Sequence, residues 1–266
     1  MPEPHFTNYH THTARCRHAV GTEEAYIQTA LRSGYTVLGF SDHTPWKYAD
    51  PHFVSRIRML PEELDGYVQT LSALRERYAD RLHIHIGLEA EYFPAYLPWL
   101  DEEMERLGIE YLVFGCHYDT TDETGRYFGR PESGKDLRRY AEQVTAGLET
   151  GRYACLAHPD ICLNRWIAYD KDAEAACREI CAAAAHTNTP LEYNLAGLTC
   201  QNRGDGTLGY TTDFFWKIAA EYPFKALIGC DAHAPEELDV TGLIQRKRQF
   251  LSGLGLTVLD TLPGLE

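Results

Sequence analysis

Short apolar runs alternate with helical patterns along the chain, which is typical of a parallel sheet with crossover helices. Strands are expected in the run that begins at Phe6 and at residues 36–40, 82–88, 111–114, 153–157, 190–193 and 225–228. Helices are expected at residues 22–33, 61–78, 98–107, 135–149, 173–185, 212–222 and 241–253. Thr22 is placed to cap the first of these helices and Gly34 to end it. The pattern therefore predicts an α/β protein with seven β/α units.

Side chains that can bind metals follow most of these apolar runs. His10 and His12 follow the first run, and Asp231 and His233 repeat the same spacing after the last. The nine candidates are His10, His12, His18, His43, Glu89, His117, His158, Asp231 and His233. In a β/α barrel the carboxyl ends of the strands converge on one site. Residues 1–266 are therefore expected to form one domain, a TIM-like barrel with a metal site at its mouth.

Net charge and cysteine usage narrow the classes of function. A formal net charge of −14 disfavours nucleic acid as a partner, because nucleic-acid surfaces need a basic patch. No apolar run is long enough to cross a membrane, and no signal sequence is seen at the N-terminus. The eight cysteines lack paired zinc-binding spacing. They are expected to be reduced thiols packed as small hydrophobes in a cytoplasmic protein.

The ligand types predict the chemistry of the site. Seven imidazoles and two carboxylates suit borderline divalent ions, namely zinc, manganese or iron. A zinc site takes about four protein ligands, so the candidates imply two or three ions with a bridging carboxylate. Such ions hold a hydroxide at neutral pH and clamp the attacking and leaving oxygens of a displacement. A small-molecule phosphate ester is the expected substrate, because uncatalysed phosphate-ester hydrolysis is among the slowest reactions known.

Each motif alone has an ordinary explanation. A His-x-His pair such as His10-Thr-His12 occurs by chance, and a structural role for it is about equally plausible. Glu89 ends an apolar strand, where a bare carboxylate is costly to bury, and Glu91 is the alternative ligand. We favour Glu89 because it is the first acidic residue after the strand. The prediction depends on the joint arrangement, since chance does not place ligands at so many strand ends.

Taken in order, the motifs resemble those of the polymerase-and-histidinol-phosphatase (PHP) family. They are His10-Thr-His12, Arg17-His18, Ser41-Asp42-His43, Gly87-Leu-Glu-Ala-Glu91, Gly115-Cys-His117, Ala157-His-Pro-Asp160 and Gly229-Cys-Asp-Ala-His233. The resemblance covers nearly the whole chain, and it implies a distorted seven-stranded (β/α)7 barrel with a trinuclear metal centre. It assigns ligands as follows: His10, His12, Glu89 and Asp231 for the first ion, His18, His43 and His233 for the second, and His117 and His158, sharing Glu89, for the third.

Within the family, the segments Gly-Leu-Glu-Ala-Glu-Tyr and Asp-Ala-His-Ala-Pro-Glu-Glu-Leu look most like histidinol-phosphate phosphatases. This resemblance implies hydrolysis of L-histidinol phosphate to histidinol and phosphate in histidine biosynthesis. Asp231, or a second-site histidine such as His233 or His43, is the expected catalytic acid for the leaving alkoxide.

Substrate-binding residues are expected on the loops that follow strands five and six. Arginine suits a phosphate group best, and Arg165 and Arg203 are the candidates, with a surface ion pair as the equal alternative for each. The amine and imidazole of the substrate need acidic or amide partners. The candidates for that role are Asp160, Asn164, Glu192 and Asn194.

Two rival hypotheses stay open at this stage. A family phosphoesterase could act on a sugar phosphate, a nucleotide or an oligonucleotide end, and the loop of residues 43–60 carries Trp46, Lys47, Arg56 and Arg58. A metal-binding module without catalysis is the other. It is disfavoured because a structural zinc site is closed and uses one cluster.

Overall fold

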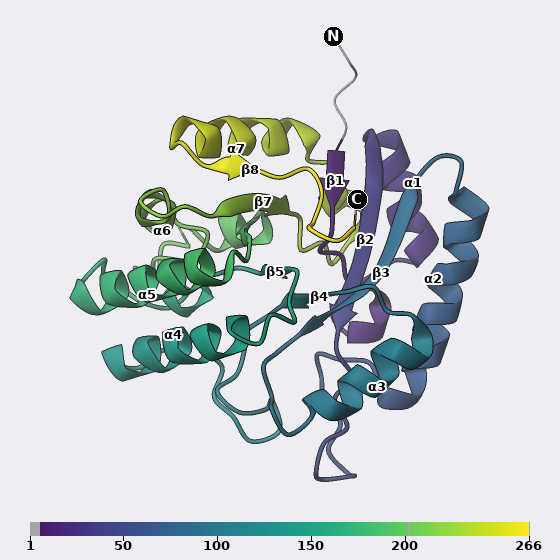
Figure 1. The fold of residues 1–266 in the computed structure, drawn as a ribbon, viewed down its shortest axis with the longest axis horizontal. Helices are drawn as coiled ribbons and strands as arrows, with labels where there is room; N and C mark the ends of the chain where they lie inside the picture. Colours follow the sequence, from purple (N-terminus) through teal and green to yellow (C-terminus); the bar gives the residue numbers. More distant parts are fainter. Residues whose placement is uncertain (1–5, 202, 266) are drawn as a thin grey trace. The chain divides into compact units, whose positions relative to one another are not determined.

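A computed structural model describes residues 6–201 and 203–265 of the chain (Figure 1). The residues fall into two compact units. The first unit comprises the described residues of Met1–Val113 together with Cys230–Gln245, and the second those of Phe114–Gly229 and Arg246–Glu266. None of the helices in the described ranges is both long and apolar enough to span a membrane.

The described residues contain seven α-helices and eight β-strands. The strands are β1 (Phe6–Asn8), β2 (Tyr35–His43), β3 (His83–Ala90), β4 (Tyr111–Phe114), β5 (Cys155–Leu156), β6 (Leu191–Asn194), β7 (Lys225–Gly229) and β8 (Thr257–Val258). The α-helices are α1 (Glu23–Arg32), α2 (Leu64–Tyr78), α3 (Leu97–Leu107), α4 (Gly134–Leu148), α5 (Lys171–Thr187), α6 (Asp213–Ala219) and α7 (Thr241–Gly253). Five 3₁₀ helices are η1 (Ala14–Cys16), η2 (Pro61–Glu63), η3 (Ile161–Leu163), η4 (Ala196–Cys200) and η5 (Pro235–Leu238).

The expected strand–helix alternation is confirmed, but the expected count of seven strands is wrong by one. The additional strand is β8, which follows α7 and pairs in parallel with β7 through Ala226 and Val258. A two-residue strand is too short to show the alternation of side chains from which strands are recognised in a sequence.

In the first unit, β1, β2 and β3 pair in parallel, and α2 packs on β3. Thr22 caps α1 as expected, because its side chain accepts a hydrogen bond from the Ala25 amide. Gly39 and Gly87 leave room for the ring of Tyr111, which a Cβ at either position would meet. The Tyr111 hydroxyl donates to the Tyr9 carbonyl at 2.8 Å, so the glycines allow a tight contact across the strands.

In the second unit, β5 pairs with β6, β6 with β7 and β7 with β8, all in parallel. Helices α4 and α5 run side by side (Figure 1), and α5 buries small side chains such as Ala176, Cys177 and Ala184. None of the eight cysteines, which all lie within the described residues, forms a disulfide. Seven of them are buried, as expected for thiols packed as small hydrophobes.

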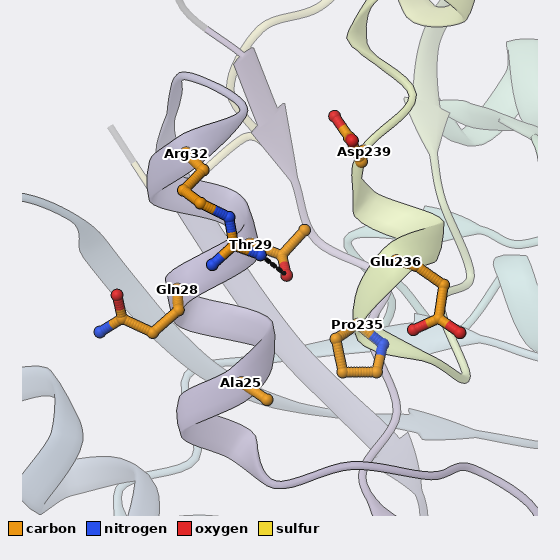
Figure 2. A pocket seen from close by; sticks show the side chains of 7 residues that line it. All are labelled: Ala25, Gln28, Thr29, Arg32, Pro235, Glu236 and Asp239. Carbon is orange, nitrogen blue, oxygen red and sulfur yellow. Dashed lines mark hydrogen bonds between the residues drawn. The ribbon is translucent and has the colours of Figure 1, made fainter.

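An open pocket of about 490 Å³ lies between α1 and η5 in the first unit (Figure 2). It is lined by Ala25, Gln28, Thr29, Arg32, Pro235, Glu236 and Asp239. Arg32 donates to the Thr29 hydroxyl, and Asp239 accepts from Ser33. Since no predicted ligand lines this pocket, the candidate site lies elsewhere.

Candidate metal centre

The first unit brings together seven of the nine predicted ligands. The two His-x-His and Asp-x-His segments lie side by side, because Thr11 and Ala232 form a parallel bridge. The His12 amide donates to the Ala232 carbonyl at 2.9 Å. Residues two apart in an extended chain point to the same face, so His10 and His12 share one side. Asp231 has a φ of 51°, outside the extended region, and the bridge at Ala232 brings Asp231 and His233 beside His12. The ligands gathered in this unit are His10, His12, His18, His43, Glu89, Asp231 and His233.

His10, His12 and Asp231 form a first cluster with the spacing that one ion requires, and Glu89 lies beside its two histidines. The Nε2 atoms of His10 and His12 are 3.2 Å apart, and they lie 3.4 and 3.1 Å from one Asp231 oxygen. Both nitrogens lie 3.7 Å from an oxygen of Glu89. Donors held about 2.1 Å from a tetrahedral ion are themselves about 3.4 Å apart. The donors of His10, His12 and Asp231 therefore fit a divalent ion, with the Glu89 carboxylate close to both histidines.

His18 and His233 form a second cluster. Their Nε2 atoms face each other at 2.9 Å. The Nδ1 atom of His18 donates to the Cys16 carbonyl at 2.9 Å, and that of His233 donates to the Asp231 carbonyl at 3.0 Å. A neutral imidazole with its hydrogen on Nδ1 carries a lone pair on Nε2. Two lone pairs therefore face each other, and a cation between them would turn the repulsion into binding.

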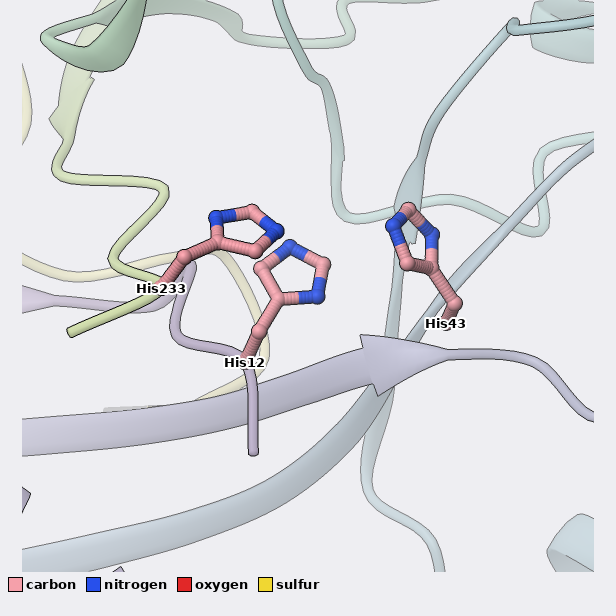
Figure 3. Close-up of side chains that lie close together, drawn as sticks. All are labelled: His12, His43 and His233. Atoms are coloured by element: carbon pink, nitrogen blue, oxygen red, sulfur yellow. The ribbon is translucent and has the colours of Figure 1, made fainter. Parts of the chain in front are cut away.

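His43 completes the group of ligands. Its Nδ1 lies 2.9 Å from a Glu89 oxygen. Figure 3 shows the rings of His12 and His233 close together, with His43 facing them from β2. One donor nitrogen from each of these three histidines lies within 4.8 Å of the others. The first unit thus holds donors for more than one divalent ion.

Asp42 contacts two of the ligands, His12 and His43. It is fully buried, and its oxygens accept hydrogen bonds from the His43 amide at 2.8 Å and the Thr13 amide at 3.2 Å. One of its oxygens lies 3.5 Å from Nδ1 of His12. Burial alone would raise the pKa of Asp42, but His12 and the Thr13 hydroxyl outweigh burial and lower it. An ionised carboxylate there orients the His12 ring for metal binding.

Glu91, the alternative to Glu89, has a different role. Arg58 donates to both of its carboxylate oxygens, one bond measuring 3.0 Å, and Trp46 Nε1 donates to one of them at 2.9 Å. All three side chains are buried. Glu91 therefore belongs to a buried ion pair, whereas Glu89 faces the histidines. The same contacts place Arg58 and Trp46 in the interior, where neither can serve as a nucleic-acid surface.

The protonation states of the first cluster follow from its charges. Burial raises the pKa of Asp231, but the neighbouring histidines, His10 foremost, outweigh burial and bring it well below its usual value. Burial and the charge of His12 lower the pKa of His233 to about 4. Burial would lower the pKa of His12, yet Asp231, Asp42 and Cys16 raise it well above its usual value. His12 is therefore the protonated side chain of the metal-free cluster.

Metal binding is expected to weaken as the pH falls, because an ion and a proton compete for His12. Below its raised pKa His12 stays protonated in the metal-free protein, so the ion that binds at the first cluster must displace that proton. Calorimetric titration with zinc at about pH 6, 7 and 8, in buffers of different ionisation enthalpy, should show proton release and an affinity that rises with pH. Affinity that is constant across this range, without proton release, would contradict the assignment.

The second unit contains the remaining two ligands, His117 and His158. Their Nε2 atoms are 3.2 Å apart. His158 has a φ of 30°, a strained value for a residue with a Cβ, and its amide donates to Glu192 at 3.1 Å. Gly229 makes room for the Glu192 carboxylate, which a Cβ at this position would meet. The chain thus holds His158 in a conformation that presents its ring to His117.

The predicted substrate residues also lie in the second unit. Asp160 is buried and accepts from the amides of Thr211 and Thr212, both at 2.8 Å. Burial, which these bonds only partly offset, raises its pKa. Asn194 donates to Glu192 at 2.8 Å and accepts from the Gly197 amide. Both side chains therefore hold the turns around β6 in place, and their contact with substrate stays a prediction.

The remaining substrate candidates differ in exposure. Arg165 is about two-fifths exposed and donates to Asp205 at 2.6 Å. Arg203 is exposed and contributes to the low pKa of Asp205, after hydrogen bonds from Thr207. Asn164 is buried, and its Oδ1 accepts no hydrogen bond from the described residues. The two arginines thus both act on one carboxylate, that of Asp205.

Two residues near the ligands escaped the sequence prediction. Cys16 is fully buried beside His18, and Asp42 directly precedes His43. Burial would raise the pKa of the Cys16 thiol, but hydrogen bonds with His12 and His18 lower it. The spacing of Cys16 and His18 repeats the i, i+2 spacing of the other ligand pairs, and this was the signal available in the sequence.

Comparison with known proteins identifies the family of the chain. A model of the PHP domain family matches residues 8–196, well over half of the chain. A protein of Deinococcus radiodurans named probable histidinol-phosphatase is 27% identical over 236 residues, which are 86% of this chain and 86% of the relative. A Schizosaccharomyces pombe protein of the same name is 30% identical over 115 residues, 41% of this chain and 38% of the relative.

One solved structure extends the comparison to the fold. It is a histidinol phosphate phosphatase from Lactococcus lactis, crystallised with zinc, L-histidinol and phosphate. Its TM-score is 0.73 at 17% identity, with 97% of both chains covered. At this identity the likeness establishes a common fold.

Proposed function

This chain belongs to the PHP domain family, and we propose that it is a metal-dependent phosphomonoesterase that hydrolyses L-histidinol phosphate to histidinol and phosphate. The observation that carries the proposal is the convergence of buried imidazole and carboxylate donors in the first unit at the spacing of one ion. The names of the Deinococcus and Schizosaccharomyces relatives support histidinol phosphate as the substrate. The ligands crystallised with the Lactococcus enzyme point to the same substrate and to zinc.

We propose three divalent ions, zinc, manganese or iron, at the ligands present. His10, His12, Glu89 and Asp231 would hold the first, and His18, His43 and His233 the second. His117 and His158 would hold a third, and the sharing of Glu89 with that ion stays a prediction. Such ions supply Lewis acidity towards phosphoryl oxygens and lower the pKa of water.

The chain's own residues would handle the protons of the reaction. Asp231, His233 and His43 are the proposed catalytic residues. The pKa of His233 is lowered, so its imidazole is neutral and leaves Nε2 for the second ion, since Nδ1 donates to the Asp231 carbonyl. The pKa of Asp231 is lowered as well, so its carboxylate is unprotonated at neutral pH and would first accept a proton from the attacking water. The proton would then go to the leaving alkoxide of histidinol.

Binding of the substrate is assigned to the second unit. Arg165 and Arg203 would contact the phosphate, for which a guanidinium fork is the best protein partner. Asp160 and Asn194 would receive the amine and imidazole of the substrate, and the open acceptor Oδ1 of Asn164 is a further partner for either group. A single TIM-like barrel domain spanning residues 1–266 and a cytoplasmic location stay predictions.

Phosphate release from a substrate panel tests the proposal. Protein loaded separately with zinc, manganese or iron would be assayed on L-histidinol phosphate, sugar phosphates, nucleotides and an aryl phosphate. We expect a kcat/KM of about 10⁴ M⁻¹s⁻¹ or more for histidinol phosphate, within the ordinary range of enzymes and well above the panel. Slow, indiscriminate turnover would leave a metallophosphatase and overturn the histidinol assignment. No turnover with any metal would overturn phosphatase activity itself.

A further inference from the structure

A thiol lies among the histidines of the second cluster. Cys16 is fully buried, and its Sγ lies within 4.8 Å of donor nitrogens of His18 and His233, which are themselves within that distance of each other. A thiolate about 2.3 Å and an imidazole about 2.1 Å from one zinc ion are about 3.6 Å apart. Small side-chain shifts would bring all three donors to one ion.

The local backbone is built to present Cys16 and His18 together. Thr13 caps the short helix η1 with its side chain, and Arg17 then adopts a left-handed conformation with a φ of 70°. This conformation is costly for a residue with a Cβ. The sharp turn puts the side chains on either side of Arg17 within reach of the same point.

An independent observation points to a cation at this place. The Nε2 lone pairs of His18 and His233 face each other at 2.9 Å, because a backbone carbonyl holds the hydrogen of each ring on Nδ1. In addition, donor atoms of His12, Cys16 and Asp42 form a second close group, in which an Asp42 oxygen lies 3.5 Å from Nδ1 of His12. Donors arranged in this way repel one another unless a cation or a proton lies among them.

The sulfur of Cys16 has a compensating donor of its own. The Ala19 amide donates to Sγ at 3.3 Å. Backbone amides directed at a metal-bound sulfur stabilise its negative charge and tune the site. The amide would have the same effect on a thiolate at this position.

We propose that Cys16 supplies a thiolate ligand to the ion held by His18 and His233. Binding exchanges the thiol proton for the ion, and the proton leaves to solvent. A thiolate is a soft ligand, so this site would select zinc over manganese, whereas the carboxylate-rich first cluster accepts either ion. The inference depends on the proposed metal centre but on no particular substrate.

Cobalt loading tests the ligand directly, because a thiolate bound to Co²⁺ gives a near-ultraviolet charge-transfer band that imidazole and carboxylate ligands do not. We expect the band in the Co²⁺-loaded protein and its loss in Cys16→Ser. We also expect Cys16→Ser to lower the ratio of zinc to manganese affinity by at least about tenfold. The matched control is Cys230→Ser, another buried cysteine of the first unit, which should keep the band.

The rival arrangement is a thiol that binds no ion and only hydrogen-bonds to His12. It predicts no band in the cobalt protein, and that result would overturn the proposal, as would a band that survives in Cys16→Ser. If Cys16→Ser does not fold, zinc X-ray absorption on the unaltered protein decides, since a zinc–sulfur distance of about 2.3 Å is diagnostic. Phosphatase activity is measured separately, so an absent thiolate with normal turnover would contradict this inference and leave the proposed function standing.

Discussion

Glu89→Gln is expected to remove metal and phosphatase activity from a stable protein, whereas Glu91→Gln is expected to destabilise the fold. Glu89 lies 3.7 Å from the Nε2 atoms of both His10 and His12 and 2.9 Å from Nδ1 of His43. Glutamine keeps the shape of the side chain but loses the charge that a cation requires. We expect a loss of activity greater than the about 10–100-fold that removal of an outer partner of a metal ligand causes.

Glu91→Gln acts on Arg58 instead. Both members of this pair are buried, so the substitution leaves a guanidinium inside the first unit without its counter-charge. Removing one partner of a buried ion pair costs about 3–5 kcal/mol of the free energy of unfolding. Urea unfolding and metal analysis of both variants would separate the two effects. Glu76→Gln, at an exposed position of α2, is the control and should change stability by less than about 0.5 kcal/mol.

The opposite pattern would overturn the assignment. If Glu91→Gln lost metal at unchanged stability and Glu89→Gln unfolded, the two glutamates would have exchanged roles. The sequence alone could not choose between them, because both follow the same strand at positions two apart and so point to the same side. Only the position of Arg58, more than thirty residues away along the chain, separates them.

The ligands could be predicted because each follows an apolar run. His10, His12, Asp231 and His233 come from opposite ends of the chain, yet the bridge between Thr11 and Ala232 gives them a common face. A sequence shows where apolar runs end and which candidate ligands are two residues apart. It also shows that both features recur along the chain. Cys16 shows the limit of this reasoning, since a buried thiol beside a histidine has the same appearance as ordinary packing.

The substrate residues were harder to predict, because they lie on loops whose contacts depend on distant residues. Asp160 resembles an exposed acid after a strand, but the amides of Thr211 and Thr212 occupy both its oxygens. Arg165 finds Asp205 forty residues further along. Strand β8 was missed for another reason, since its two residues show no periodicity. Local patterns therefore place the ligands of the metals but not the partners of the substrate.

His117→Ala is expected to lower kcat by about 10²–10³-fold while the second unit stays folded. Lewis-acid stabilisation by an ion is worth several kcal/mol, and each tenfold of rate corresponds to about 1.4 kcal/mol. His117 faces His158 with 3.2 Å between their Nε2 atoms, so the variant leaves a single imidazole at this place. Steady-state kinetics, metal content and a thermal melt would be measured together. His186→Ala, an exposed histidine of the same unit, is the control and should match the unaltered protein in all three.

The same variant separates an enzyme from a metal-binding module. In a module the ions serve only stability, so loss of a ligand should lower the melting temperature in proportion to the metal lost. In an enzyme the loss should fall on kcat with KM little changed, because the ion acts on the transition state more than on the bound substrate. A large drop in stability with unchanged turnover per folded molecule would therefore contradict a catalytic role for the third ion. Loss of kcat at an unchanged melting temperature would assign His117 to catalysis, because no change in folding could account for it.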